Sequence, residues 1–317
     1  MGGRIARRRV VTLTLPDPAT DAGADPELTD RADLLAAEEP LGIRVNGEAV
    51  TLTMRTPGDD LDLAAGFLVS EGVIHSPADI SRIKVCSGQR CGHSDHEGMG
   101  NIADVTLAAG AGVPARLRRN FLTTSACGVC GKASISDICE IPGAGSDLAE
   151  DPIAVEPAML ASLPERLRRA QRIFSATGGL HAAGLFDAAG QLLVLREDVG
   201  RHNAVDKVVG WALRTGRLPL AGCVLLVSGR ASFELVQKAV MAGVPVLAAV
   251  SAPSSLAAEL AEEAGVTLVG FLRGRSMNIY TAPHRVAAVP VTAPSSSAAV
   301  GSEFRRYSDE THSQPSP

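Results

Sequence analysis

Strands and helices alternate along residues 180–271, and this alternation constrains the fold more than any other feature of the sequence. Short apolar runs predict strands at 180–187, 191–197, 223–228, 244–250 and 267–271. The segments between them predict helices at about 204–214, 233–241 and 255–264. A helix between consecutive strands lets neighbouring strands run parallel, with the helices covering the sheet. We therefore predict an α/β fold, with a layered α/β domain in the second half of the chain.

The first part of the chain is predicted to be β-rich, with a single helix. The apolar runs at 10–15, 41–45 and 49–55 predict strands, and Asn46-Gly47 predicts a tight hairpin between the last two. Thr56 and Pro57 are suited to cap and begin a helix over 57–70. These elements predict a smaller β-rich α+β domain that precedes the α/β domain.

At 317 residues, the chain is long enough for two ordinary domains, each with its own core. Residues 17–39 hold eight acidic groups and one basic residue, Arg31, and the last part of the chain is rich in Ser, Ala and Pro. We expect four parts: a mobile N-terminal strand and acidic segment (1–40), the β-rich domain (41–120), the α/β domain (121–285) and a disordered tail (286–317).

Charge and cysteine usage exclude several classes of function. The net charge of −5 gives no general reason to expect nucleic-acid binding. No apolar run approaches the length of a membrane span, and no export signal follows the arginines at 7–9. Six cysteines without such a signal favour reduced thiols. The sequence therefore predicts a cytoplasmic protein that binds neither membranes nor nucleic acid.

Cys127 and Cys130 lie two residues apart in the run TTSACGVCGKAS (123–134). Two thiols at this spacing can share a metal, form a disulfide, or hold and release a sulfur atom. The last role needs an exposed thiolate. Lys132, or a helix beginning there, would lower the pKa of Cys127 and favour that form. The spacing alone leaves all three roles open.

Three loops follow predicted strands of the α/β domain and are rich in glycine and polar residues: 197–203, 228–232 and 270–278. In this type of fold, ligands bind where strands end and helices begin. Glycine allows close backbone approach, and arginine matches phosphate oxygens. Ordinary turns with solvated arginines are the alternative interpretation for any one loop. The candidate binding residues are Arg201, His202, Asn203, Ser228, Arg230, Phe271, Leu272, Arg273, Gly274, Arg275, Ser276 and Asn278.

Together, the run at 123–134 and the stretches 178–207, 227–239 and 270–281 resemble the formate dehydrogenase accessory sulfurtransferase family, the FdhD family. The resemblance covers roughly residues 10–281. It implies a cytidine-deaminase-like fold for the C-terminal domain and a homodimer. It also implies that Cys127 accepts persulfide sulfur from a cysteine desulfurase. The sulfur then passes to the molybdenum of bis-molybdopterin guanine dinucleotide, which binds at 271–276 before it enters formate dehydrogenase.

A competing interpretation assigns the cysteines to zinc. Cys86 and Cys91, followed by His93 and His96, would join Cys127 and Cys130 in a tetrahedral site. Zinc on Cys127 would block sulfur transfer, so the alternative function is a zinc-stabilised chaperone that binds the molybdenum cofactor and carries no sulfur.

The motifs of two other cysteine-based activities are incomplete, and the role of Cys130 stays open. A zinc deaminase needs a His-x-Glu motif, and His181 is followed by Ala182 and Ala183 instead. A thioredoxin-like dithiol would need a βαβ context that the glycine-rich run lacks. Cys130 either resolves or relays the sulfur held on Cys127, or takes no part.

Overall fold

A computed structural model describes residues 3–20, 25–87, 101–109 and 148–286, which belong to one compact unit. Its strands are β1 (Ile5–Thr14), β2 (Glu27–Ala36), β3 (Glu39–Val45), β4 (Glu48–Arg55), β5 (Ile80–Ser87), β6 (Asn101–Leu107), β7 (His181–Asp187), β8 (Leu192–Asp198), β9 (Cys223–Val227), β10 (Val246–Ala249), β11 (Thr267–Arg273) and β12 (Ser276–Ile279). Its helices are α1 (Asp60–Ser70), α3 (Pro157–Ala170), α4 (Arg172–Thr177), α5 (Arg201–Arg214), α6 (Phe233–Met241) and α7 (Ser255–Glu263), with short 3-10 helices η1 (Pro77–Asp79) and η3 (Pro283–Arg285). No helix in these ranges is long and apolar enough to cross a membrane. The predicted α/β fold class is confirmed.

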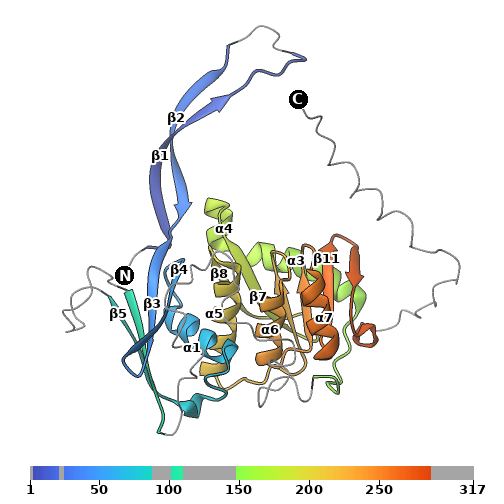
Figure 1. Cartoon of the computed structure of the whole chain (residues 1–317). Helices are drawn as coiled ribbons and strands as arrows, with labels where there is room; N and C mark the ends of the chain where they lie inside the picture. Colours follow the sequence, from blue (N-terminus) through green and yellow to red (C-terminus); the bar gives the residue numbers. More distant parts are fainter. Residues whose placement is uncertain (1–2, 21–24, 88–100, 110–147, 287–317) are drawn as a thin grey trace, which may run out of the picture. The chain divides into compact units, whose positions relative to one another are not determined.

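A six-stranded mixed sheet with the order β12-β11-β10-β9-β7-β8 organises the second half of the chain. Strands β9, β10 and β11 run parallel, as the alternation of strands and helices predicts. Strand β7 is antiparallel to both β8 and β9, so β8 points the same way as β9. Helices α5, α6 and α7 cover one face of the sheet and α3 covers the other (Figure 1). The strands β8 to β11 therefore end at one common edge.

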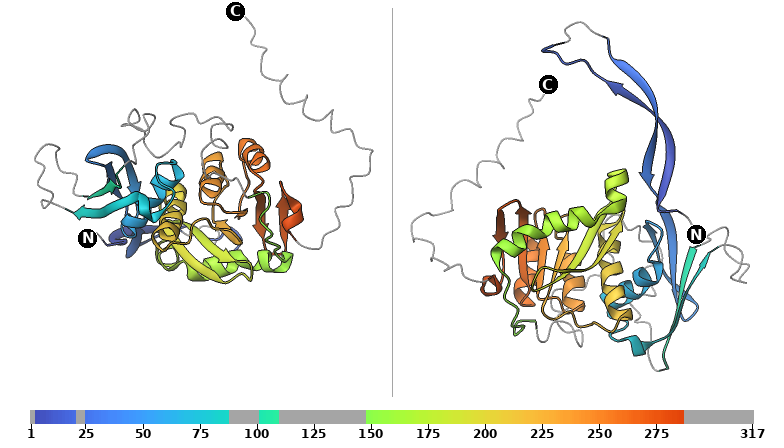
Figure 2. Two further views of the ribbon diagram at one scale, coloured as in Figure 1. Left: turned by 90° about the horizontal axis from the view of Figure 1, so that it is seen from below. Right: turned by 180° about the vertical axis from the view of Figure 1, so that it is seen from behind.

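The first half of the chain forms a four-stranded sheet with the order β4-β3-β6-β5. Asn46 and Gly47 connect β3 and β4 with φ angles of 52° and 82°, which confirms the predicted hairpin. Helix α1 packs against this sheet and against α5 (Figure 2).

The two sheets share a hydrophobic core. One continuous cluster of buried side chains includes Leu41 and Ile43 of the four-stranded sheet together with Val205 of α5 and Leu225 of β9. A second cluster lies on the other face of the six-stranded sheet, beneath α3. This arrangement differs from the expectation of two domains with separate cores, because α1 and α5 pack directly on each other.

Helix α1 begins three residues later than the sequence predicts. Thr56 does not cap it: the Thr56 amide donates to Asp198 Oδ2 at 3.1 Å, and its hydroxyl accepts from the amide of Val199 at 3.1 Å. The helix starts after Asp59, whose φ is 57°. Thr56 thus holds the end of β4 against the end of β8, a long-range contact that a capping motif does not encode.

Residues 27–36 of the acidic segment are part of the folded structure, contrary to our expectation. They form β2, which pairs antiparallel with β1 over ten residue pairs and makes a separate two-stranded sheet. The run at 10–15 predicted the second half of β1. Strand β2 was not predicted, because its sequence is rich in charged residues. Helices α3 and α4 were also not predicted. The expected tail lies outside the described residues from residue 287 on, whereas Val286 is buried and bridges to Val155.

Candidate functional site

The polar loops lie along one edge of the six-stranded sheet, where β8, β9, β10 and β11 end and β7 begins. From β8 to β11 this edge spans four strand spacings, or about 19 Å. Helices α5, α6 and α7 begin directly after three of the loops, so their N-terminal amides also face this edge. We call this row of loops the carboxyl edge. It suits an extended anionic ligand better than a compact one.

Hydrogen bonds between neighbouring loops make the carboxyl edge continuous. Ala182 N donates to Ser228 Oγ at 2.9 Å, which joins the start of β7 to the end of β9. Ala231 N donates to Ala252 O at 3.2 Å, and Phe271 N donates to Ser251 O at 3.1 Å. These bonds fix the loops relative to one another, so ligand groups bound to different loops would meet a preorganised surface.

His181 and Arg201 lie together at the β7–β8 end of the carboxyl edge. A Cβ atom at Gly229 would lie 3.3 Å from His181 Nδ1 and 3.9 Å from Arg201 Cδ, so glycine permits this close approach. Burial lowers the pKa of His181, and the positive charge of Arg201 lowers it further, which keeps the imidazole neutral near pH 7. The buried Nε of Arg201 finds no acceptor among the described residues. Such a nitrogen can donate to an oxygen of a bound ligand.

His202 contacts the start of α6. Its Nε2 lies 3.4 Å from Ser232 Oγ and 3.7 Å from a carboxylate oxygen of Glu234. The contact with His202 lowers the pKa of Glu234 to about 2 despite partial burial. Glu234 is therefore ionised at physiological pH and lies beside the His202 ring.

Phe271 marks the other end of the carboxyl edge with an unusual backbone conformation. Its φ is 50°, it lies where the β11–β12 register shifts, and the residue is 41% exposed. A bulky residue with positive φ is strained, and such strain concentrates at functional positions. Arg273 Nε donates to Val250 O at 2.9 Å. This bond occupies Nε, and the two terminal nitrogens of Arg273 have no hydrogen bond to other described residues.

The structure places most of the predicted binding residues on the carboxyl edge. Arg201 and His202 begin α5, and Ser228 and Arg230 follow β9. Phe271 and Arg273 end β11, Gly274 and Arg275 form the turn, and Ser276 begins β12. Asn278 lies in β12, opposite Gly270.

Two predicted side chains do not face the carboxyl edge. Asn203 is buried, where its amide donates to Met54 O at 2.8 Å and Asp198 Oδ1 at 3.1 Å and its oxygen accepts from Thr53. Leu272 packs in the core beneath α3. Only the backbone of Leu272 can contact a ligand, and the Asn203 side chain holds α5 against β4.

The cysteine motif lies outside the described residues, as do Cys91, His93 and His96, so the roles of Cys127 and Cys130 stay predictions. Cys86, at the end of β5, is disulfide-bonded rather than a reduced thiol. A disulfide sulfur is not a thiolate, so in this state Cys86 differs from the zinc ligand of the competing interpretation. Among the residues that the structure describes, no group of three His, Cys, Asp or Glu side chains is placed to hold a metal.

Sequence reasoning missed His181, Glu234 and Ser251 as parts of this site. His181 pairs with Asp198 across the β7–β8 hairpin, and Glu234 follows the predicted 228–232 loop by two residues. The short connection between the predicted strands at 180–187 and 191–197 was the local signal for His181, because it returns the start of β7 to the end of β8.

Comparisons with known proteins agree on one family. The model of the FdhD/NarQ family matches residues 36–287. The sulfur carrier protein FdhD of Mycolicibacterium paratuberculosis is 58% identical over 282 residues, covering 89% of this chain and 98% of that protein. The Streptomyces avermitilis protein of the same name is 56% identical over 286 residues, covering 90% and 97%. A crystal structure of a protein from Desulfotalea psychrophila, assigned as a formate dehydrogenase accessory protein, has a TM-score of 0.63 and 25% identity, covering 90% of this chain and 100% of that one.

Proposed function

Because this chain belongs to the FdhD/NarQ family, we propose that it is a sulfur carrier in the maturation of formate dehydrogenase. In this proposal the thiolate of Cys127 attacks the terminal sulfur of a cysteine desulfurase persulfide. The new S–S bond forms as the old one breaks, and the desulfurase leaves as a thiolate, so no outside oxidant or reductant is needed. Cys127 then holds the persulfide sulfur for delivery.

The acceptor in this proposal is the molybdenum of bis-molybdopterin guanine dinucleotide, bound as a substrate along the carboxyl edge. The observation that carries this placement is the continuity of the edge from Arg201 to Arg273, with the unpartnered Nε of Arg201 at one end. A dinucleotide with two pyrophosphates needs several separated donors, and arginines suit phosphate oxygens. Exposed Phe271 offers an aromatic face to a guanine base.

Sulfur loading tests the carrier function directly. After incubation with a cysteine desulfurase and cysteine, we expect the intact protein to gain the mass of one sulfur, and Cys127→Ala to gain none. Cys130→Ala should have an equal or smaller effect. Metal analysis of the same sample separates the alternative, because bound zinc without sulfur would indicate a chaperone instead. Wild-type loading of Cys127→Ala would refute the assignment of Cys127.

GDP binding tests the substrate site independently of sulfur transfer. GDP represents part of the nucleotide portion of the cofactor. We expect Arg273→Ala to weaken GDP binding by about 1.5–3 kcal/mol, the scale of a charge-assisted hydrogen bond. The matched control is Arg169→Ala, an exposed arginine on α3 that pairs with Glu165. Isothermal calorimetry should show unchanged affinity for that control. Equal GDP affinities for wild type, Arg273→Ala and Arg275→Ala would indicate that the binding site lies near Arg201 and Arg230 instead.

A further inference from the structure

Three polar side chains at the β7–β8 end of the carboxyl edge have donors available for a ligand. No hydrogen bond to the described residues occupies the ring of His181, and the buried Nε of Arg201 also lacks an acceptor among them. The Ser228 hydroxyl accepts from Ala182 N at 2.9 Å, so its own hydrogen can point to a ligand. Buried polar groups are normally satisfied by protein, water or a bound molecule. These side chains therefore form a candidate site for a ligand rich in acceptor oxygens.

The loop after β9 brings the three side chains together. Gly229 of this loop lies against His181 and Arg201, and Ser228 directly precedes it. The Ser228 amide donates to Ala182 O at 3.0 Å, in addition to the bond that its hydroxyl accepts. Both bonds hold the loop against the start of β7. The donors are thus fixed in position before a ligand arrives, which lowers the entropic cost of binding.

The charges around His181 disfavour its protonated form. Burial lowers the pKa of His181, and the positive charges of Arg201 and His202 on α5 act in the same direction. Asp198 of β8 acts in the opposite direction, but its carboxylate is already paired with Lys207 Nζ at 2.6 Å. The two residues of the β9 loop beside the ring are uncharged. A second cation next to Arg201 is therefore unfavourable unless an anion lies near both.

A phosphate group suits this set of donors. A carboxylate has two oxygens, whereas a terminal phosphate offers three oxygens to three separate donors. Its negative charge also offsets the repulsion between Arg201 and a protonated His181, because an opposite charge nearby favours the charged form of the imidazole. Binding of a phosphate and protonation of His181 should therefore favour each other.

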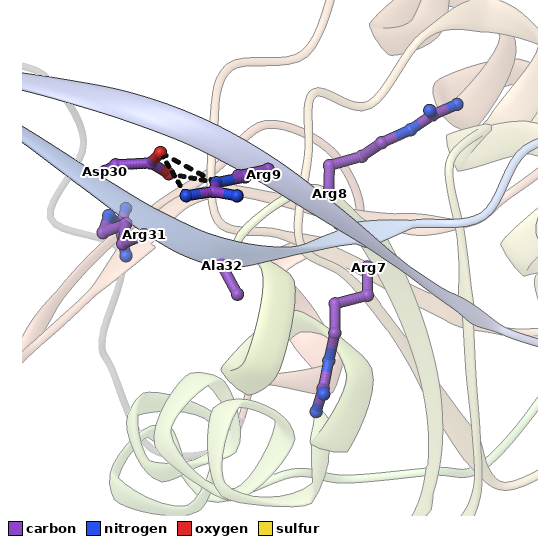
Figure 3. A pocket seen from close by; sticks show the side chains of 6 residues that line it. All are labelled: Arg7, Arg8, Arg9, Asp30, Arg31 and Ala32. Atoms are coloured by element: carbon purple, nitrogen blue, oxygen red, sulfur yellow. Dashed lines mark hydrogen bonds and ion pairs between the residues drawn. The ribbon is translucent and has the colours of Figure 1, made fainter.

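A second group of arginines lacks this geometry. Arg7, Arg8, Arg9 and Arg31 surround an open hollow of about 450 Å³ on the two-stranded sheet of β1 and β2 (Figure 3). Arg7 and Arg8 point to opposite sides of the strands, and Arg9 is bonded to Asp30 at 2.8 Å. Exposed cations that diverge are screened by salt and do not meet one anion together. This group therefore provides a control for the effect of charge alone.

We propose that His181, Arg201 and Ser228 form a phosphate subsite in which the imidazole takes up a proton when the anion binds. This inference rests on the nucleotide site of the proposed function and assigns one phosphate of the nucleotide to the β7–β8 end of the carboxyl edge. Arg201 and Ser228 donate to the phosphate, and protonation makes the hydrogen bond from His181 charge-assisted. By linkage, the affinity falls as the pH rises from the lower pKa of the free ring to the higher pKa of the bound ring.

Calorimetry of GDP binding to the full chain tests the proton uptake. Titrations at pH 7 in two buffers of different ionisation enthalpy give the number of protons bound together with GDP. Wild type should take up more protons than His181→Asn, which keeps a polar side chain but cannot titrate. This variant also corrects for the phosphate, whose own pKa is about 6. We expect it to bind GDP about fivefold more weakly, the scale of one hydrogen bond, and the control Arg8→Ala to match wild type.

The possible outcomes separate this inference from the proposed function. Equal proton uptake by wild type and His181→Asn would overturn the phosphate subsite, even if Arg273→Ala weakens GDP binding as expected. The nucleotide site would then remain at the β11 end of the carboxyl edge. If folded wild type bound no GDP, the subsite and the nucleotide site would both be refuted.

Nuclear magnetic resonance measures the titration of His181 directly. The signals of its imidazole are those that disappear in His181→Asn. GDP should shift the titration of this ring to higher pH. In the free protein, Arg201→Ala should shift it in the same direction, because a nearby positive charge is lost, whereas Arg8→Ala should leave it unchanged. A His181 titration that GDP does not move would contradict the proposal.

Discussion

Gly66→Ala is expected to destabilise the protein by at least about 3 kcal/mol, the upper end of the usual cost of overpacking. Helices α1 and α5 cross with their backbones in contact at Gly66 and Gly210. A Cβ on Gly66 would overlap the carbonyl group of Asp206, and one on Gly210 would overlap that of Asp62. The obstacle is backbone rather than a flexible side chain, so the helices would have to move apart. Their separation would open the core that the two sheets share.

The sign of this change makes the prediction specific. Alanine in place of glycine inside an exposed helix normally stabilises by about 0.5–1 kcal/mol, because glycine loses more entropy on folding. Chemical unfolding of Gly66→Ala, Gly210→Ala and the control Gly42→Ala measures the difference. At Gly42 in β3 the nearest atoms to an added Cβ lie 3.8 Å away, an ordinary contact, so the control should change little. A Gly66→Ala protein as stable as wild type would show that the helices do not cross this closely.

Lys207→Met is expected to cost about 3–5 kcal/mol, the scale of breaking one side of a buried ion pair. Lys207 Nζ lies 2.6 Å from Asp198 Oδ2 and 2.8 Å from Thr56 O, and the two side chains are 1% and 0% exposed. Methionine keeps most of the apolar stem, so the loss comes mainly from the carboxylate of Asp198, which stays buried without its cation. Thermal or chemical unfolding measures the cost.

An exposed ion pair provides the matched control. Arg169 and Glu165 pair at 2.8 Å on the surface of α3 with 77% and 63% exposure, so Arg169→Ala should change stability by about 0.5 kcal/mol or less. A similarly small loss of stability in Lys207→Met would indicate that water reaches Asp198.

Loss of the Lys207 contact should also weaken ligand binding at the carboxyl edge. Asp198 Oδ1 accepts from Gly200 N at 2.8 Å and from Asn203 Nδ2 at 3.1 Å, which shapes the loop that carries Arg201 and His202. We therefore expect Lys207→Met to reduce GDP affinity under conditions where the variant is still folded. In this way the contact between the two sheets also positions the proposed substrate site.

Local patterns were sufficient for the regular elements of this protein. The parallel strands, α6 over Phe233–Met241 and the turn at Asn46-Gly47 all match their predictions, because strand and helix periodicities and turn preferences act over a few residues. The same patterns placed the glycine- and arginine-rich loops at the carboxyl ends of strands. The sequence by itself therefore determined the α/β class and most residues of the carboxyl edge.

Only the tertiary structure decided which polar side chains face that edge. The sequence predicts Asn203 as a ligand residue and Thr56 as a helix cap. In the structure, each side chain instead makes contacts between segments about 140 to 150 residues apart. His181 joins Arg201 only because β7 returns beside β8, and Leu272 turns into the core at an irregular strand end. The direction of a side chain depends on what packs against its element, and that information is spread over distant parts of the chain rather than contained in any local motif.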